Sequence, residues 1–110
     1  MGRETALASL NMEMRRGTIV LCVLSRLDKP MYGYNLVGEL EKKGLPVEAN
    51  TLYPLLRRLA SQGLLKSSWD MSTAKPRKYY VITKKGIEVR SQLKSEWKQM
   101  SDAMNKMIAG

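Results

Sequence analysis

Apolar residues recur along most of the chain at the spacing of one helix face, and this pattern predicts four helices. The first, residues 15–27, is apolar on nearly every side of its centre, so it must be covered all round, and we expect a second subunit to cover one flank. The second and third helices are predicted at residues 34–44 and 50–62. The last runs from about residue 84 to residue 108.

Short polar residues, proline and glycine mark the boundaries of these helices. Residues 28–33 contain a proline and a glycine and predict a connector. Either Glu48 or Asn50 caps the third helix, and Pro54 then deletes a backbone hydrogen bond, which predicts a distorted first turn. Thr83 is the expected cap of the last helix.

The N-terminal part of the chain leaves its own structure open. Residues 1–13 form either a helical extension or a loose arm, which Gly17 would separate from the first helix.

Cys22 is the single cysteine, so an internal disulfide is excluded and a reducing compartment is favoured; its apolar neighbours predict a buried thiol of low reactivity. The apolar run at residues 19–24 is shorter than the ~20 residues of a membrane span, and no cleavage site follows it. We therefore expect a cytoplasmic protein without a membrane partner.

Between the third and last helices the pattern changes to the alternation of strands. Residues 64–70 alternate and residues 78–83 are rich in β-branched and aromatic side chains, so together they predict a hairpin, which we call the wing. Residues 71–77 between them lack an Asn-Gly or Asp-Gly turn and predict a projecting cationic loop. Trp69 is expected to pack on the domain.

This order of elements predicts an α+β, mostly helical fold: a winged helix-turn-helix followed by a long C-terminal dimerisation helix. The second and third helices are joined by a short turn, and the wing follows the third directly. We divide the chain into a DNA-binding domain at residues 1–83, whose helix at 14–27 is shared with the dimer interface, and a dimerisation helix at 84–110.

Charge and residue usage narrow the function. The net charge is +9, from 19 Lys and Arg against 10 Asp and Glu, which favours nucleic acid as partner before an acidic membrane surface. The chain has no histidine, no metal-ligand spacing, no glycine-rich phosphate loop and no nucleophile with an evident base. We therefore expect no enzymatic activity, no metal and no cofactor.

The third helix carries the candidate recognition surface. Its inward face holds Leu52, Leu55, Leu56 and Leu59. The opposite face is polar and cationic, as a helix in the major groove requires: Arg binds guanine edges or phosphates, Asn binds adenine, and Thr or Tyr hydroxyls bind phosphates. The wing and its flank add five cations, Lys75, Arg77, Lys78, Lys84 and Lys85. The candidate DNA-binding residues are Tyr34, Asn50, Thr51, Tyr53, Arg57, Arg58, Lys75, Arg77 and Lys78.

The tyrosines have competing interpretations. Tyr53 either packs through its ring alone or also reaches a phosphate with its hydroxyl. Tyr34 lies at the start of the second helix, where backbone N–H groups favour a phosphate. Tyr79 and Tyr80 alternate across a strand, so one is expected in the core and the other half exposed, and neither is assigned to DNA.

The last helix carries an apolar stripe whose members are spaced by four and three residues in alternation, the spacing of a coiled-coil seam. A domain of this size offers the stripe no partner, and leaving it exposed would create an apolar patch that monomers rarely tolerate. We therefore expect a homodimer. The candidate interface residues are Val20, Leu24, Leu93, Trp97, Met100, Met104 and Met107.

Three segments together resemble the PadR family of bacterial transcriptional regulators. They are YGYNL at 32–36, NTLYPLLRRLASQGLL at 50–65 and KPRKYYVITKKG at 75–86. The resemblance covers roughly residues 14–105, and the short last helix is similar to the smaller branch of the family. Two departures stand out: Asn50 takes the place of a glycine that often precedes Thr-Leu-Tyr, and the loop at 71–77 lacks the glycine often found there.

The resemblance implies a dimeric repressor that binds double-stranded operator DNA. Residues 50–62 would enter the major groove, and the wing tip, residues 71–78, would lie along the adjacent minor groove or backbone. The first and last helices would make the dimer. It also implies a small planar hydrophobic effector between the paired last helices, held by Trp97, Met100 and Met104; alternatively, Trp97 is a plain dimer-core residue.

Two other functions fit the same sequence. A non-specific or architectural DNA-binding winged-helix protein without an effector would bind through phosphates, with little discrimination and a steep salt dependence. A protein-interaction module whose basic face is incidental would not bind DNA at physiological salt. Sequence-specific operator binding is our leading hypothesis.

Overall fold

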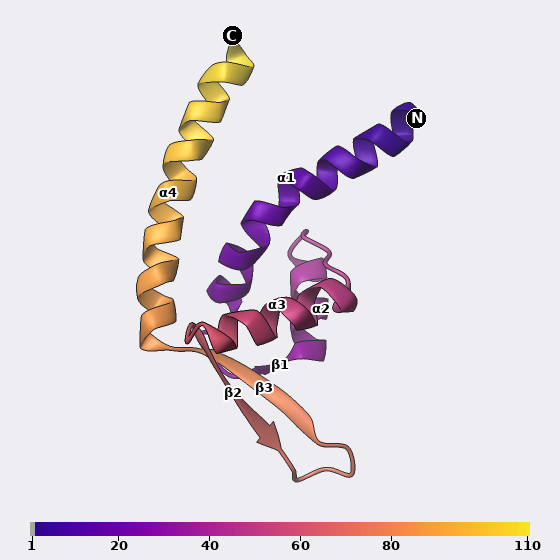
Figure 1. Ribbon diagram of the computed structural model, residues 1–110, viewed down its shortest axis with the longest axis vertical. Helices are drawn as coiled ribbons and strands as arrows, with labels where there is room; N and C mark the ends of the chain where they lie inside the picture. The colour runs from indigo at the N-terminus through magenta and orange to yellow at the C-terminus, as the bar shows by residue number, and fades with distance from the viewer. Residues whose placement is uncertain (1) are drawn as a thin grey trace.

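Two long helices project from one side of the fold and a hairpin projects from the other (Figure 1). The computed structural model of the chain describes residues 2–110. In chain order the elements are α1 (Arg3–Arg26), β1 (Met31–Tyr32), α2 (Gly33–Lys42), α3 (Ala49–Ser61), β2 (Leu65–Asp70), β3 (Arg77–Ile82) and α4 (Lys84–Ala109). The predicted α+β, mostly helical winged helix-turn-helix architecture is confirmed.

The structure decides one open alternative and corrects one element of the sequence prediction. Residues 3–13 are a helical extension, because α1 continues without a break through Gly17; one glycine costs a helix about 1 kcal/mol, which is too little to interrupt it. The connector at 28–33 contains the short strand β1, which pairs with β3 through Met31–Tyr80 and Tyr32–Tyr79. The sheet therefore has three strands in the order β1-β3-β2 rather than two.

The hydrophobic core lies where α1, α2 and α3 meet the base of the wing. It consists of Val23, Leu24, Leu27, Leu36, Leu40, Val47, Leu52, Leu56, Leu59, Leu64, Leu65, Tyr80 and Ile82. Three of the four α3 leucines are buried as predicted, and Leu55 is only half-buried because it lies on the shoulder that faces α1. Tyr80 is in the core and Tyr79 is half-buried, as the alternation predicted.

Glu48 occupies the N-cap of α3, without a side-chain cap hydrogen bond. Its carbonyl accepts from the N–H groups of both Thr51, at 3.0 Å, and Leu52, at 2.9 Å, so the first turn is tightened. The helix then continues through Pro54. The proline therefore does not break α3, and the outward face of the helix stays continuous.

The start of α4 is part of the same core. As predicted, Thr83 caps the helix: its Oγ1 accepts from the Gly86 N–H at 3.0 Å. A side chain at Gly86 would overlap the carbonyl oxygen of Leu64, so glycine allows the helix to lie directly on that backbone. Four residues further on, Arg90 donates to the Leu24 carbonyl at 3.1 Å. These contacts fix the direction in which α4 leaves the domain.

Candidate nucleic-acid interface

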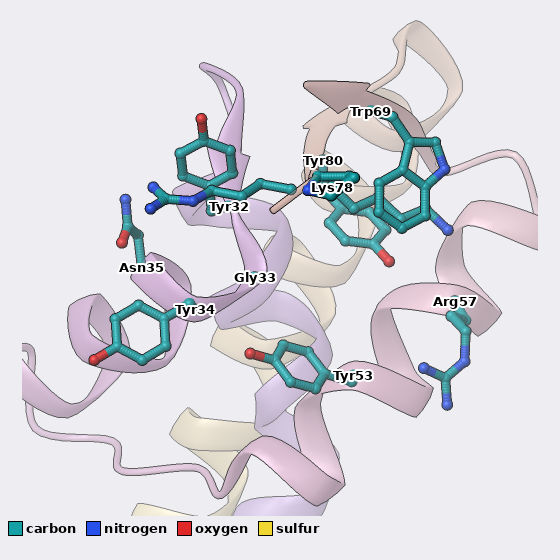
Figure 2. Close-up of a pocket in the computed structure, with 11 residues that line it drawn as sticks. Tyr32, Gly33, Tyr34, Asn35, Tyr53, Arg57, Trp69, Lys78 and Tyr80 are labelled. Carbon is teal, nitrogen blue, oxygen red and sulfur yellow. The ribbon is translucent and has the colours of Figure 1, made fainter. Parts of the chain in front are cut away.

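A cavity of about 590 Å³ opens between the start of α2, the outward face of α3 and the wing (Figure 2). Its walls are aromatic and cationic. They include Tyr32, Tyr34, Tyr53, Arg57, Trp69, Arg77, Lys78 and Tyr80. Five of the nine candidate DNA-binding residues therefore lie around one cavity, although they come from three separate parts of the chain.

The wing cations lie over aromatic rings. The Arg77 guanidinium carbon lies 5.0 Å from the centroid of the Tyr32 ring. The Lys78 ammonium lies 5.7 Å from the Trp69 centroid and 5.6 Å from that of Tyr80. Attraction between a cation and a ring face favours these positions. Both charges are therefore held near the cavity and not left to move freely in solvent.

A hydrogen-bond network fixes the wing to the start of α2. The Tyr32 hydroxyl donates to Asp70 Oδ2 at 2.8 Å and accepts from the Tyr79 hydroxyl at 2.5 Å, while the two tyrosine rings stack with centroids 3.9 Å apart. Asp70 Oδ1 accepts from the Ser72 hydroxyl at 2.6 Å and from the Ser72 N–H at 2.9 Å. The network thus joins β1, β2 and β3 to Ser72 in the wing loop.

The same bonds shift two pKa values. The Ser72 hydroxyl, the Ser72 N–H and the Tyr32 hydroxyl, in that order, stabilise the ionised carboxylate and lower the pKa of Asp70 to about 2. The hydrogen bonds to Tyr79 and Asp70 raise the pKa of Tyr32. Asp70 is therefore ionised at neutral pH, and its charge also attracts that of Arg77, its cross-strand partner.

Gly33 allows α2 and α3 to approach closely at the floor of the cavity. A Cβ atom there would lie 2.7 Å from Cε1 of Tyr53. The ring of Tyr53 is half-buried beneath α2, and it points from α3 toward the start of that helix (Figure 2). Tyr53 therefore packs as one interpretation predicted; whether its hydroxyl also reaches a phosphate stays a prediction.

The remaining candidate DNA-binding residues lie elsewhere. Thr51 and Arg58 line a second, smaller cavity of about 300 Å³ on the opposite shoulder of α3, where Arg16 of α1 faces them. Asn50 and Lys75 line neither cavity, and both are exposed, the first at the start of α3 and the second in the wing loop. The face of α3 thus has cations on both sides.

Two residues of the wing and its flank differ from the prediction. Trp69 does not pack on the domain: 60% of it is exposed, because the end of β2 extends past the core that buries Leu65 at the strand's other end. Lys85 does not extend the cationic surface of the wing, since its Nζ donates to the Gln62 carbonyl at 2.9 Å and so caps the end of α3. The sequence could have indicated that Trp69 is exposed, because this residue lies next to the projecting loop.

The candidate dimer and effector residues fall into three environments. Leu24 is completely buried inside its own chain, so it has no surface left for a second subunit, and Val20 and Leu93 are half-buried against the core. Trp97 lines an apolar cavity of about 550 Å³ between α1, the end of α2 and α4. Met100, Met104 and Met107 do not line it; they lie further along α4 and are exposed.

Cys22 lines the same apolar cavity as Trp97. Partial burial raises the pKa of its thiol, which agrees with the predicted low reactivity.

The N-terminal half of α1 is also apolar and exposed, at Leu7, Leu10, Met12 and Met14. Both projecting helices therefore carry uncovered hydrophobic side chains.

Residues 2–110 contain no helix that is both long and apolar enough to cross a membrane. Within the same described residues, no group of three or more His, Cys, Asp or Glu side chains is placed to hold a metal ion.

Comparison with known proteins identifies relatives over almost the whole chain. The model of the "Transcriptional regulator PadR-like family" matches residues 20–92. The crystal structure of a PadR family transcriptional regulator from Eggerthella lenta is 48% identical, with a TM-score of 0.91 over 96% of this chain and 94% of that one. A PadR-like transcriptional regulator from Bacillus cereus is 33% identical, with a TM-score of 0.78 over 89% of this chain and 98% of the other. Transcriptional regulator Rv3488 of Mycobacterium tuberculosis is 29% identical over 89% of this chain and 90% of its own.

Proposed function

This chain belongs to the PadR-like family of DNA-binding transcriptional regulators, and from that membership we propose that it is a homodimeric, sequence-specific repressor released by a small planar hydrophobic effector. Its relatives are transcriptional regulators and not enzymes. The proposed operator-binding site lies on α3 and the wing, whereas the proposed dimer interface and effector site share residues of α4.

One observation supports the proposed DNA-binding site: α3 has an exposed face with cations on both sides of it. An α-helix is ~10–12 Å across with its side chains, and the major groove is ~12 Å wide. With α3 in the groove, Asn50 and Arg57 are the proposed readers of base edges, and Thr51 and Arg58 are the proposed phosphate contacts on the α1 side. The wing brings Lys75, Arg77 and Lys78 to the backbone on the other side.

The proposed dimer interface consists of the two projecting helices. Met100, Met104 and Met107 are between 52% and 79% exposed, so no other part of residues 2–110 buries them. Pairing about a two-fold axis would bury these side chains and the exposed apolar residues of α1, and would set two α3 helices about one DNA turn, ~34 Å, apart. Residues 1–83 then act as the DNA-binding unit and residues 84–110 as the dimerisation helix, with the α1 segment at 14–27 shared between them.

The proposed effector site includes Trp97, because this indole already forms one wall of an apolar cavity. In a dimer, Met100 and Met104 of paired α4 helices would extend that surface with flexible, polarisable side chains that adapt to a flat ligand. Ligand binding there would change how the α4 helices pair and hence the spacing of the two α3 helices. We expect this regulator to act in the cytoplasm, where its DNA lies.

Footprinting on the DNA upstream of this protein's own gene and its neighbours tests the proposal. A protected site with two-fold symmetry is the expected result. Protection that covers DNA uniformly would favour a non-specific winged-helix protein instead, and no protection at physiological salt would overturn DNA binding. Sedimentation equilibrium at micromolar concentration tests the dimer separately: a monomer of 12.5 kDa that still binds its site tightly would contradict it.

A further inference from the structure

Trp69 is a large aromatic side chain that the core does not use. It lies on β2 near the wing loop and is 60% exposed. A single exposed hydrophobic residue needs no explanation by itself. This one, however, lines the cavity between α2, α3 and the wing, beside Lys78 and across from α3. In Figure 2 the indole of Trp69 and the side chain of Arg57 flank the same end of this cavity, one from the wing and one from α3.

The charges around Trp69 define what the cavity accepts. Its lining includes three cations, Arg57, Arg77 and Lys78, and no carboxylate. Asp70, the next residue on β2, does not line the cavity, and its single negative charge offsets only part of these three positive charges. The cavity therefore attracts an anion, and the indole places an apolar surface 5.7 Å from the Lys78 ammonium, measured to the ring centroid.

A DNA backbone presents both an anion and an apolar surface, because each phosphate is joined to a deoxyribose with an apolar face. We propose that the backbone of one DNA strand enters this cavity, where the indole of Trp69 contacts a deoxyribose and Lys78 binds the phosphate next to it. The inference rests on the proposed DNA-binding function and assigns a further contact residue to it. The Tyr32–Tyr79–Asp70 network fixes the end of β2, next to Trp69, to the start of α2.

This role predicts two effects that separate Trp69 from its cationic neighbours. A contact between an indole and a sugar carries no sequence information and releases no counterion. Trp69→Ala should therefore weaken binding about tenfold on specific and random duplexes alike, with the slope of log K against log salt unchanged. Lys78→Ala should instead flatten that slope by about 0.9. Trp69→Phe, which keeps an aromatic surface, should lose less affinity than Trp69→Ala.

The test uses the whole chain labelled with 5-fluorotryptophan. The two tryptophans give two ¹⁹F signals, and the Trp69→Phe variant assigns them. The solvent isotope shift of the Trp69 signal, measured between H₂O and D₂O, should fall when a duplex carrying the protected site is added. Anisotropy of the labelled duplex reports binding independently. If the duplex binds but the solvent isotope shift of Trp69 is unchanged, this inference is wrong and the proposed DNA-binding function still stands. Absence of any binding would overturn the proposed function, and this inference with it.

Discussion

Removing two cations from the wing tests whether this hairpin meets the DNA backbone. Lys75 is exposed in the wing loop, and Arg77 lies 5.0 Å from the Tyr32 centroid at the rim of the cavity. We expect the double variant Lys75→Ala with Arg77→Ala to bind both specific and random duplexes more weakly. Its salt dependence should also be flatter, because each phosphate contact releases a condensed counterion.

The size of the change follows from the number of contacts. One lost phosphate contact lowers the slope of log K against log salt by about 0.9, and two lower it by about 1.8. Between 50 and 200 mM salt each contact accounts for about a 3.5-fold loss of affinity, so the parent should lose about tenfold more affinity over this range than the double variant. Anisotropy titrations of a labelled duplex across these salt concentrations measure both slopes.

A matched control is Lys98→Ala with Lys106→Ala, which removes the same charge from α4, the helix that projects away from the wing (Figure 1). This control should leave the slope within about 0.3 of the parent, since neither lysine would meet a phosphate. The reasoning is refuted if the wing variant keeps the slope of the parent, or if the control flattens it equally. The second result would mean that net charge, and not wing contact, governs the salt dependence.

Further predictions concern α3, α4, the core and the wing network. Arg57→Ala should cost about 1–3 kcal/mol on the protected site and relax specificity at one position, as measured by competition among single-base variants; an equal loss on random DNA would make Arg57 a phosphate contact. Met104→Glu places like charges near the proposed two-fold axis and should shift sedimentation toward monomer and weaken operator binding together; an undisturbed dimer would remove Met104 from the interface. Gly86→Ala should lower the free energy of unfolding in urea by about 1–3 kcal/mol or more, because the new methyl overlaps the Leu64 carbonyl; an unchanged midpoint would contradict that packing. Since the pKa of Asp70 is lowered from 3.8 to about 2, its carboxylate stabilises the fold above pH 4 and this contribution is lost as pH falls toward 2. Asp70→Asn should therefore be less stable than the parent at neutral pH, with the difference shrinking below pH 4; parallel stability curves would show that the network does not contribute.

Sequence patterns predicted the elements whose signal is repeated over many residues. The helical spacing of the α3 leucines and of the stripe along α4 repeats over several turns, and Thr83 has the chemistry of a cap, so these features could be found without coordinates. Strand β1 has only two residues, Met31–Tyr32, which is too short for any periodicity. It exists because β3 offers it an edge to pair with, and that edge is a tertiary feature.

The candidate site was harder to predict because exposure depends on where an element ends relative to the core. Alternation places Leu65 and Trp69 on the same side of β2, yet the first is buried and the second is not, since the strand leaves the core between them. The location of a charged side chain is equally hard to predict. Lys85 follows the wing cations in the sequence, but in the structure its ammonium binds the end of α3. Sequence alone also could not show that Tyr32, Asp70 and Tyr79, far apart in the chain, form one network.

The central claim is that this regulator recognises a specific DNA sequence. The most direct measurement is the ratio of its Kd values for the footprinted site and for a shuffled duplex of the same length and composition, both determined at physiological salt. The account predicts a preference of at least about 10³-fold for the footprinted site, with two chains bound per duplex. A ratio near one would contradict it, and would instead identify a winged-helix protein that binds any DNA through its phosphates.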